Sequence, residues 1–352
     1  MDLERRLELI VSPPAEEVIT EEELRQLLET NDHPKAYDGF EPSGIPHIAT
    51  GLMRAEYGKD LETAGVDFTV LLADWHAYLN NKLGGDLEKI QEAGRFFVKV
   101  WELLGWKPRM VWASEMVEDP EYWATLMRIS KEVTISRIKR AAPIMGRKEA
   151  EVQQASFLLY PLMQATDIKY LDVDICQLGM DQRRVNVMYR EIAEKVGWKK
   201  PVLVHHHLLM GLQAGKRMDY STEEAQMELK MSKSKPGTAI YVTDSPEDIR
   251  RKLKNAYCPA GQIENNPVID IVKNIILRRR GMKLKVERPR KYGGDVEYTS
   301  FQELAQDFQE GKLHPLDLKN AVADWLIERL GSVRNYVDRH PEVMEIARRL
   351  TR

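Results

Sequence analysis

The sequence predicts an α/β fold: a doubly wound, Rossmann-like parallel sheet with a helical insertion, plus a mainly helical C-terminal domain. Two observations predict it. Between residues 35 and 204, short apolar runs typical of buried strands alternate with longer segments of helical periodicity. After Thr243 the apolar pattern is helical, with polar loops. We therefore expect a Rossmann-like domain over residues 1–243 and a mainly α-helical domain over residues 244–352.

The expected elements follow in order along the chain. Residues 1–30 are expected to be helical, with Thr20 as a cap and Glu23 completing a capping box. Strands are expected at Lys35–Phe40, Phe68–Leu72, Met110–Trp112, Leu171–Leu178 and Val202–Val204, and helices at about Thr50–Ala64, Asp86–Leu104 and Gly179–Gly197. The pattern from residue 121 to about 170 is mostly helical, which predicts a helical insertion at about 114–160. The second domain is expected to begin with a helix capped by Ser245, with Pro246 at its first position.

The composition is ordinary for a chain of 352 residues, with 43% hydrophobic and 30% charged residues. No run of 18 apolar residues occurs, and the charged N-terminus lacks the apolar core of a signal peptide, so we expect no membrane association. Because Cys176 and Cys258 are the two cysteines, no disulfide framework is implied and a reducing cytoplasm is expected.

Basic residues are concentrated locally, although the net charge is −3. Eight lysines and arginines lie between residues 278 and 291 with one acidic residue among them, and Arg137, Lys139 and Arg140 form a second cluster. Such patches on an acidic body suit an RNA that is bound at a few phosphates. A solvated face or a linker remains the alternative for the first cluster.

The segment from Lys230 to Gly237 interleaves three lysines with two serines on a loop that ends in Pro-Gly. Lysines supply positive charge to phosphates, hydroxyls and backbone N–H groups supply short donors, and Gly lets the backbone bend around a ligand. A solvated charge run would account for the lysines but not for the serines. The loop resembles the KMSKS signature of class I aminoacyl-tRNA synthetases in all five positions, which implies amino-acid activation by ATP.

A second nucleotide-binding pattern lies near the N-terminus. A strand-like run ending at Phe40, a turn rich in Gly and Pro, and a following helix form an anion-binding arrangement of N–H groups. Within the turn, residues 47–50 read His-Ile-Ala-Thr and resemble the HIGH motif of the same family in its first two positions. Ala49 stands where the family has Gly. Thr50 stands where it has the second His, and it can donate a hydrogen bond but carries no positive charge.

Three constellations of polar residues indicate a buried ligand pocket. Tyr160, Gln164 and Asp167 share one face of a helix in an apolar stretch, where buried polar groups need partners that a ligand can supply. Gln182 follows a Gly turn at the end of a predicted strand, and His76 follows the end of another. In an open α/β sheet, the carboxyl ends of the strands are where ligands bind.

These segments, together with the run from Tyr37 to Gly44, look like those of tyrosyl-tRNA synthetases of the archaeal/eukaryotic branch, over most of the chain from about Tyr37. The resemblance implies that Tyr37 and Asp167 hydrogen-bond the phenol of tyrosine, which phenylalanine would leave unpaired. It assigns the α-amino group to Tyr160, Gln164 and Gln182, the ring pocket to His76 and Leu71, and the ATP site to Gly39, His47, Thr50, Lys230, Met231, Ser232 and Lys233.

The implied reaction has two steps. The carboxylate of tyrosine attacks the α-phosphorus of ATP to give tyrosyl-adenylate and pyrophosphate, and the tyrosyl group then passes to the 3′ end of tRNA(Tyr). His47, Lys230 and Lys233 are the expected catalytic residues, because they can stabilise charge on the phosphates. Mg²⁺ is expected with ATP, held mainly by phosphate oxygens and water, with no tightly bound cofactor and no metal held by the protein.

The resemblance also implies a homodimer and two tRNA contacts. In this family the helical insertion contributes to the dimer interface and to the acceptor stem, which makes Arg137, Lys139 and Arg140 candidates. The segment from His314 to Asn320 matches the anticodon-reading segment, so Asp317 would accept hydrogen bonds from the first anticodon base and Tyr292 would stack on it. Without the resemblance, Asp317 is equally an ordinary carboxylate at a helix N-terminus.

Three other interpretations stay open. A tryptophanyl-tRNA synthetase shares the fold and both signatures, but an indole needs partners other than Tyr37 and Asp167. The complete tyrosine constellation argues against a non-catalytic tRNA-binding relative, and the anticodon-like segment argues against a small-molecule nucleotidyltransferase.

The residues from His205 to His207 follow a strand in which neighbours alternate faces, so we expect loop residues near the ATP site rather than a metal site.

Overall fold

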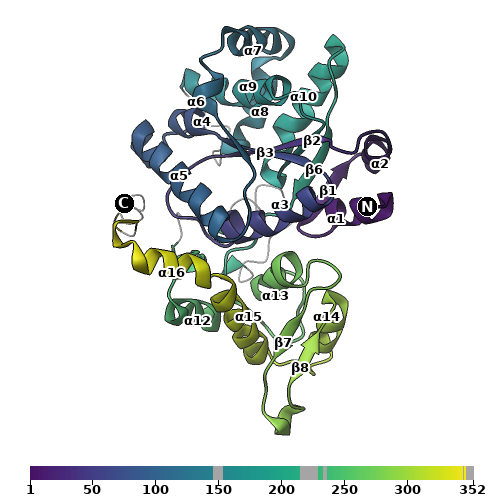
Figure 1. Ribbon diagram of the computed structural model, residues 1–352, viewed down its shortest axis with the longest axis vertical. Coiled ribbons are helices and arrows are strands. Elements are labelled where there is room, and N and C mark those ends of the chain that lie inside the picture. Colours follow the sequence, from purple (N-terminus) through teal and green to yellow (C-terminus); the bar gives the residue numbers. More distant parts are fainter. Residues whose placement is uncertain (146–153, 215–228, 233–235, 344, 346–352) are drawn as a thin grey trace.

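The structure is a computed structural model that describes residues 1–352 except 146–153, 215–228, 233–235, 344 and 346–352. A six-stranded sheet with helices on both faces forms the upper body in Figure 1, and the C-terminal helices lie below it. The strand order is β1-β6-β5-β2-β3-β4. The predicted α/β fold with a mainly helical C-terminal part is confirmed.

The sheet is parallel except at one edge. Its strands are β1 (Ala15–Ile19), β2 (Lys35–Phe40), β3 (Asp67–Leu72), β4 (Arg109–Trp112), β5 (Ile175–Gly179) and β6 (Val202–His206). All neighbours pair in parallel except β1, which runs antiparallel to β6. The five predicted strands are confirmed, although β5 begins later than expected because residues 171–174 form a turn.

The N-terminal thirty residues, which the sequence predicted to be helical, are not helical throughout. They form α1 (Leu3–Val11), strand β1 and α2 (Glu21–Thr30). The predicted capping box is present, with the Glu23 amide donating to Thr20 Oγ1 at 3.1 Å and the Thr20 amide donating to Glu23 Oε2 at 3.3 Å. Pro13 and Pro14 lack the amide that a helix needs at its interior positions. The expectation was wrong for residues 12–19, whose partner β6 lies far along the sequence.

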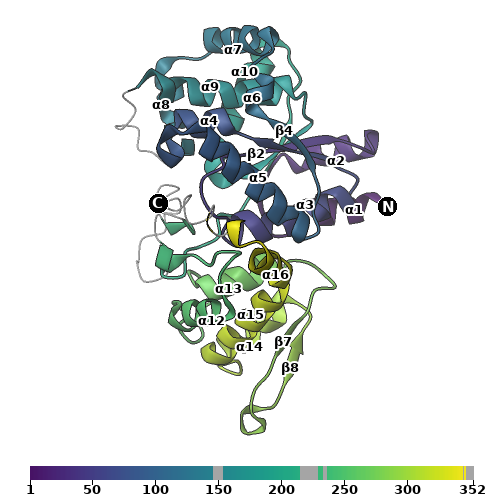
Figure 2. The ribbon, with the colours of Figure 1, turned by 60° about the vertical axis from the view of Figure 1, so that its left-hand side comes forward.

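The three predicted helices of this domain are present as η1 (Ala49–Met53) running into α3 (Arg54–Thr63), α5 (Leu87–Leu103), and η5 (Met180–Gln182) running into α10 (Arg183–Val196). The sequence did not predict α4 (Asp74–Leu79), η2 (Lys82–Gly85) or η7 (Pro236–Thr238). Asp86 caps α5, and Gly197 ends α10 in the left-handed region at φ 71°. The predicted insertion is helical: α6 (Ala113–Met116), α7 (Pro120–Glu132), α8 (Ile135–Ala141), η3 (Ala142–Met145) and α9 (Ala155–Tyr170). Figure 2 shows its helices grouped at the end opposite the C-terminal part.

The C-terminal part contains a hairpin among its helices. Ser245 caps its first helix as predicted, accepting from the Asp248 amide. The elements are α12 (Pro246–Asn255), α13 (Pro267–Ile271), η8 (Val272–Ile276), β7 (Leu284–Val286), η9 (Arg290–Tyr292), β8 (Val296–Tyr298), α14 (Phe301–Gln309), α15 (Pro315–Arg329) and α16 (Gly331–Arg339). Strands of three residues are too short to leave a clear alternating pattern, which is why the sequence did not predict the hairpin.

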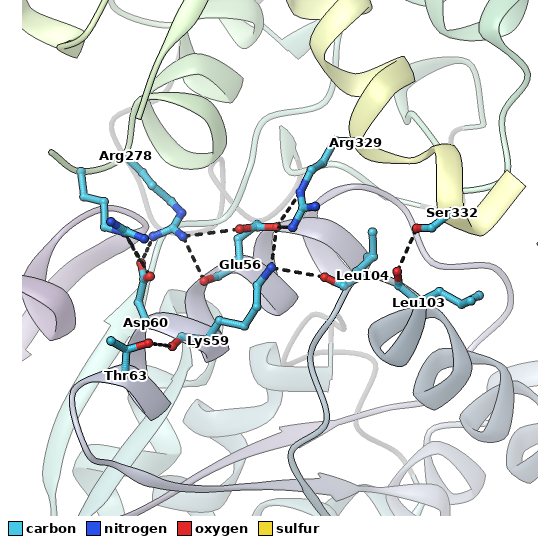
Figure 3. Close-up of polar contacts among 10 residues, drawn as sticks. Glu56, Lys59, Asp60, Thr63, Leu103, Leu104, Arg278, Arg329 and Ser332 are labelled. Atoms are coloured by element: carbon cyan, nitrogen blue, oxygen red, sulfur yellow. Dashed lines mark hydrogen bonds and ion pairs between the residues drawn. The ribbon is translucent and has the colours of Figure 1, made fainter. Parts of the chain in front are cut away.

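A buried ionic network joins α3 to the C-terminal helices (Figure 3). Arg278 forms ion pairs with Asp60 and Glu56, and its side chain is 1% exposed. Arg279 Nε lies 3.0 Å from Asp60 Oδ1, and Arg329 Nε lies 2.8 Å from Glu56 Oε1. Two of the eight basic residues between 278 and 291 thus bind carboxylates of α3. The expectation that this cluster binds RNA phosphates is wrong for Arg278, whose charge is buried.

The apolar core has two parts, one on each face of the sheet. One runs from the sheet face that packs on η1 and α3 into the C-terminal helices, and it includes Ile48, Val204, Met231 and Leu326. The other lies between the opposite face and the helical insertion and includes Tyr37, Leu71 and Tyr160. Among the residues described, no helix is both long enough and apolar enough to span a bilayer.

Candidate active site

A cluster of buried polar residues lies on the insertion side of the sheet, beside β2 and β3. Helix α9 supplies Tyr160, Gln164 and Asp167, which are all buried, as their spacing predicted. Tyr37 reaches the pocket from β2, and Leu71 from β3 contributes to the same apolar cluster. The structure therefore brings together five residues that the sequence assigned to tyrosine.

Both carboxylate oxygens of Asp167 are held from opposite sides. The Tyr122 hydroxyl donates to Oδ1 at 2.7 Å, and His76 Nε2 lies 3.0 Å from Oδ2. Burial alone would lower the pKa of His76, but the carboxylates of Asp167, Glu41 and Asp74 outweigh it and raise that pKa. These two contacts fix the position of the buried Asp167 carboxylate.

Several buried donors in this pocket lack a protein partner. Within the described part of the chain, the Tyr37 hydroxyl, Gln164 Nε2 and His76 Nδ1 have no hydrogen-bond partner. Burial, followed by the nearby Cys176, Asp167 and Asp38, raises the pKa of Tyr37, so its hydroxyl stays protonated. Buried polar groups without partners are costly, and a polar ligand would satisfy them.

Two residues of this pocket were not predicted. Tyr122, on α7, holds Asp167, and Glu41 takes a hydrogen bond from the Tyr160 hydroxyl. Glu41 also accepts from Asn80 Nδ2 at 2.8 Å. Glu41 sits in the Glu-Pro-Ser-Gly turn that the sequence had singled out, whereas Tyr122 carries no local signal because its partner is 45 residues away.

The His47 turn pairs with the segment that follows the lysine loop, on the other face of the sheet. The Ile48 amide donates to the Ile240 carbonyl at 2.9 Å, and the Val242 amide donates to the Pro46 carbonyl at 3.0 Å. His47 forms an isolated bridge with Tyr241. The chain that leaves the lysine loop is therefore paired with the His47 turn, although the two are nearly 200 residues apart in sequence.

Residues of the lysine loop take different places. Lys230 Nζ lies 2.5 Å from Asp181 Oδ2, and Met231 is buried with its amide donating to the Leu209 carbonyl at 2.7 Å. Ser232 is half-buried. Lys233 lies outside the described residues. Gln182 Nε2 donates to the Ile144 carbonyl at 3.2 Å, so this amide contacts the insertion.

The His47 turn has the geometry expected of a helix start. Thr50 Oγ1 accepts from the His47 amide and donates to the His47 carbonyl, both at 3.3 Å. Thr50, at the position of the family's second histidine, therefore stabilises the turn itself. Gly39 lies in β2 beside Tyr37, and its neighbour Asp38 forms a buried ion pair with Arg54 at the start of α3.

The three consecutive histidines lie in and just after β6 rather than in a loop. His205 Nδ1 contacts Glu17 at 2.8 Å, His206 Nδ1 contacts Arg54 and Gln177 at 3.1 Å each, and His207 lies between Glu16 and Asp270. The expectation of loop residues was wrong for His205 and His206, which are strand residues. The side chains go to different partners, and the described residues contain no group suited to hold a metal ion.

The candidate tRNA residues occupy two separate regions. Arg137 lies on α8 and forms a two-point ion pair with Glu191 at 3.0–3.2 Å, while Lys139 and Arg140 follow at the end of the same helix. Tyr292 ends η9, between β7 and β8. His314 caps α15 through its Nδ1, and Asp317 lies in the first turn.

One arginine connects the last two of these positions. Arg288 Nε donates to the Gly294 carbonyl at 2.6 Å, and its Nη1 donates to the Lys312 carbonyl at 2.7 Å. The loop that carries Tyr292 is thereby tied to the turn that precedes His314. The two predicted anticodon segments are neighbours in space.

Comparison with known proteins gives the same family at each level. The family model described as tRNA synthetases class I (W and Y) matches residues 29–331. The chain is 47% identical over 367 residues to the tyrosine–tRNA ligase of Pyrococcus furiosus, covering 98% of each chain. It is 49% identical over 345 residues to that of Aeropyrum pernix, covering 96% of this chain and 94% of the relative.

Solved structures agree. The tyrosyl-tRNA synthetase of Pyrococcus horikoshii, crystallised with L-tyrosine, matches with a TM-score of 0.91 and 46% identity over 99% of this chain and 100% of the other. The enzyme from Aeropyrum pernix matches with a TM-score of 0.86 and 44% identity over 99% of each chain. The His47 turn pairs with the chain that follows the lysine loop, and the family model, the full-length relatives and the solved structures agree. The chain belongs to the archaeal-type class I tyrosyl-tRNA synthetases, which are tyrosine–tRNA ligases.

Proposed function

We propose that the buried pocket holds L-tyrosine with its phenol between Tyr37 and Asp167. Two observations carry this assignment. The buried Tyr37 hydroxyl has no hydrogen-bond partner among the described residues, and the Asp167 carboxylate is held at both of its oxygens. Asp167 accepts a hydrogen bond from the phenol hydroxyl of the substrate. The Tyr37 hydroxyl donates a hydrogen bond to the phenol oxygen. Leu71 and His76 line the ring pocket, and an indole or an unsubstituted phenyl ring would leave Tyr37 unsatisfied.

The α-amino group of the substrate is assigned to Tyr160, Gln164 and Gln182. Gln164 and Tyr160 lie one helical turn apart on α9, which places both on the side that faces Tyr37 and His76. The His76 and Tyr160 rings are in edge-to-face contact, with centroids 5.2 Å apart. Gln182 is bonded to the Ile144 carbonyl, so it is assigned to the amino group through its Oε1, which is an acceptor.

ATP binds at the carboxyl ends of the strands, between the His47 turn and the lysine loop, with its α-phosphate next to the tyrosine pocket. Gly39, Thr50, Met231 and Ser232 border this site, and His47, Lys230 and Lys233 neutralise the charge that develops on the phosphates. Mg²⁺ enters with ATP and is held mainly by phosphate oxygens and water. The carboxylate of tyrosine attacks the α-phosphorus, pyrophosphate leaves, and the 3′ end of tRNA(Tyr) then accepts the tyrosyl group.

The tRNA is assigned to both ends of the molecule. The basic end of α8, with Arg137, Lys139 and Arg140, contacts the acceptor stem. The neighbouring η9 loop and α15 N-terminus read the anticodon, where Asp317 accepts from a guanine and Tyr292 stacks on it. We place the division between the two domains after Thr243, where the chain passes from the His47 turn to α12.

We also propose that two copies associate through the helical insertion. Large apolar side chains are exposed there: Met127 at 65%, Ile135 at 62%, Trp123 at 39% and Leu159 at 37%. Large apolar side chains that are exposed on neighbouring helices indicate a protein interface. A charged substitution of Met127 and Ile135 should shift the sedimentation coefficient from a dimer to a monomer. We further propose that the protein is cytoplasmic, because Cys176 and Cys258 are free thiols and the cytoplasm keeps thiols reduced.

The amino-acid assignment is tested by mutating its two phenol-binding residues. Tyr37→Phe and Asp167→Asn should lower kcat/KM for tyrosine in ATP–pyrophosphate exchange by at least about tenfold each, because each hydrogen bond to a desolvated partner contributes about 1–3 kcal/mol. The KM for ATP should change little. If the KM for ATP rose as much as that for tyrosine, the assignment of the pocket to the phenol would be wrong.

A further inference from the structure

An ordered chain of buried polar groups lies on the nucleotide face of the sheet. Asp38 on β2 forms an ion pair with Arg54 at the start of α3, and both side chains are less than 10% exposed. Arg54 Nη1 in turn lies 3.1 Å from Nδ1 of His206, at the end of β6. Gln177 on β5 brings its Nε2 to the same nitrogen, also at 3.1 Å. Neither signature motif includes Asp38, Arg54 or His206.

These contacts determine which nitrogen of His206 carries the proton. A guanidinium can only donate, so Nδ1 of His206 must accept from Arg54. The neutral ring therefore carries its hydrogen on Nε2. A doubly protonated ring would bring two donors face to face, and burial together with the Arg54 charge lowers the pKa of His206 well below its usual range. Burial raises the pKa of Asp38 to about 6 while Arg54 opposes that rise, so the carboxylate is charged at neutral pH and holds the guanidinium in place.

The Nε2 atom of His206 lies near Gly179, the last residue of β5. In the described residues, Nε2 of His206 has no hydrogen-bond partner, and it lies 3.5 Å from the point where a side chain on Gly179 would begin. Asp181 Oδ1 lies 2.6 Å from that same point, and Asp181 is the partner of Lys230. His206 thus presents an unpaired donor to the spot where the turn after β5 meets the lysine loop.

Strand alternation separates this spot from the tyrosine pocket. Val202 and Val204 pack in the apolar cluster that also contains Ile48 and Met231, and His206 continues the same alternation. Tyr37, Leu71 and Leu203 belong to the cluster on the opposite face. His206 is therefore on the side of the nucleotide signatures, and because its ring is neutral it suits an uncharged acceptor rather than a phosphate.

We propose that Nε2–H of His206 donates a hydrogen bond to the nucleoside half of ATP, and that Asp38 and Arg54 are positioning residues which fix its tautomer. The acceptor is a ribose hydroxyl oxygen or a ring nitrogen of adenine. The inference rests on the placement of ATP proposed above. It adds a nucleoside-binding residue to a site whose other named side chains act on the phosphates.

The test is a kinetic cycle between variants and nucleotide analogues in tyrosine-dependent pyrophosphate exchange. His206→Leu should raise the KM for ATP about tenfold and leave the KM for tyrosine within twofold, while His206→Gln, which keeps a donor, should recover most of the loss. His205→Leu, on the same strand but the opposite face, serves as the control and should leave the KM for ATP unchanged. The penalty of His206→Leu should vanish with one analogue. A deoxy-ATP identifies a ribose hydroxyl, and a deaza-ATP identifies a ring nitrogen.

The tautomer is tested without any variant. Nitrogen-15 shifts of the His206 ring in the unaltered protein at pH 7 should show a protonated Nε2 and an unprotonated Nδ1. In Asp38→Leu/Arg54→Leu, which removes both charges and leaves no buried ion unpaired, the ring should show a mixture of tautomers. A penalty that persists with every analogue, an equal rise in the KM for tyrosine, or a protonated Nδ1 in the unaltered protein would overturn the proposal. Absence of exchange in the unaltered protein would instead refute the placement of ATP.

Discussion

The Tyr122 hydroxyl lies 2.7 Å from Oδ1 of Asp167, and both groups are buried. Tyr122 belongs to α7 of the insertion and Asp167 to α9, so the contact ties the insertion to the substrate pocket. A carboxylate that is fixed in this way is preorganised for one substrate hydroxyl. Preorganisation of this kind gives selectivity, because the ordering is complete before the ligand arrives.

Replacing Tyr122 tests that arrangement. Tyr122→Phe removes one charge-assisted hydrogen bond from Asp167 and should lower kcat/KM for tyrosine about tenfold in pyrophosphate exchange. Tyr170→Phe is the matched control, since its hydroxyl donates to Asp119 at 2.8 Å on the same insertion but away from the pocket. Equal kinetics for both variants would show that Tyr122 does not position Asp167.

The first lysine of the loop should act on chemistry and not on tyrosine binding. Lys230→Met removes the charge that now pairs with Asp181, and it should lower kcat for tyrosyl-adenylate formation by about 10²-fold, the order found for charge-stabilising groups. The Kd for tyrosine, measured by equilibrium dialysis, should stay within twofold. Lys254→Met, on an exposed face of α12, should change neither quantity. A parallel loss of tyrosine affinity in Lys230→Met would mean that this lysine acts on tyrosine and not on the ATP phosphates.

His207 makes stability depend on pH. Burial by itself lowers the pKa of His207, but Asp270 and Glu16 outweigh it and raise that pKa to about 10, against an ordinary value of about 6.5. The folded state therefore holds the proton more tightly than the unfolded state. The stabilisation is complete below pH ~6.5 and is lost as the pH rises towards ~10.

The measurement is the melting temperature of the protein and of His207→Asn at several pH values. The variant should be less stable by about 1.5–3 kcal/mol near pH 6, and the difference should shrink steadily up to pH 10. His33→Asn is the control, because His33 is exposed and 3.9 Å from Asp67. A difference that grew with pH would mean that His207 is neutral in the folded protein.

The ionic network in Figure 3 should stabilise the junction between α3 and the C-terminal helices. Arg278→Met leaves the buried carboxylate of Asp60 short of a partner, and the free energy of unfolding should fall by about 3–5 kcal/mol. Lys283→Met breaks an exposed ion pair with Glu297 and should cost less than about 1 kcal/mol. Both follow from denaturant titration. Equal losses would show that burial of the network contributes nothing.

The sequence predicted β2 to β6, the helical insertion and the shared face of three polar residues on α9 because these features are local. Apolar runs identify β2 to β6, and the spacing of Tyr160, Gln164 and Asp167 on one helix identifies a common face. Strand β1 was missed because Ala15–Ile19 is polar and short, and its pairing with β6 is a long-range contact. The same reason explains Tyr122 and Arg54, whose partners come from other elements.

The basic cluster shows the opposite failure. Charge counted along the sequence cannot distinguish Arg278, which is buried against Asp60, from exposed lysines such as Lys283. The carboxylates that neutralise Arg278 lie on α3, more than 200 residues earlier. A run of basic residues therefore predicts a phosphate site only where no carboxylate of the folded protein pairs with those residues.

We propose that this pocket selects tyrosine for activation by ATP. The measurement that tests it most directly is ATP–pyrophosphate exchange with tyrosine, tryptophan and phenylalanine in parallel on the unaltered protein. Exchange with tyrosine and none above background with the other two is the predicted result, because those side chains cannot pair with Tyr37 and Asp167. Exchange with tryptophan, or with no amino acid in a folded protein that still binds tRNA, would show that the pocket does not select tyrosine for activation.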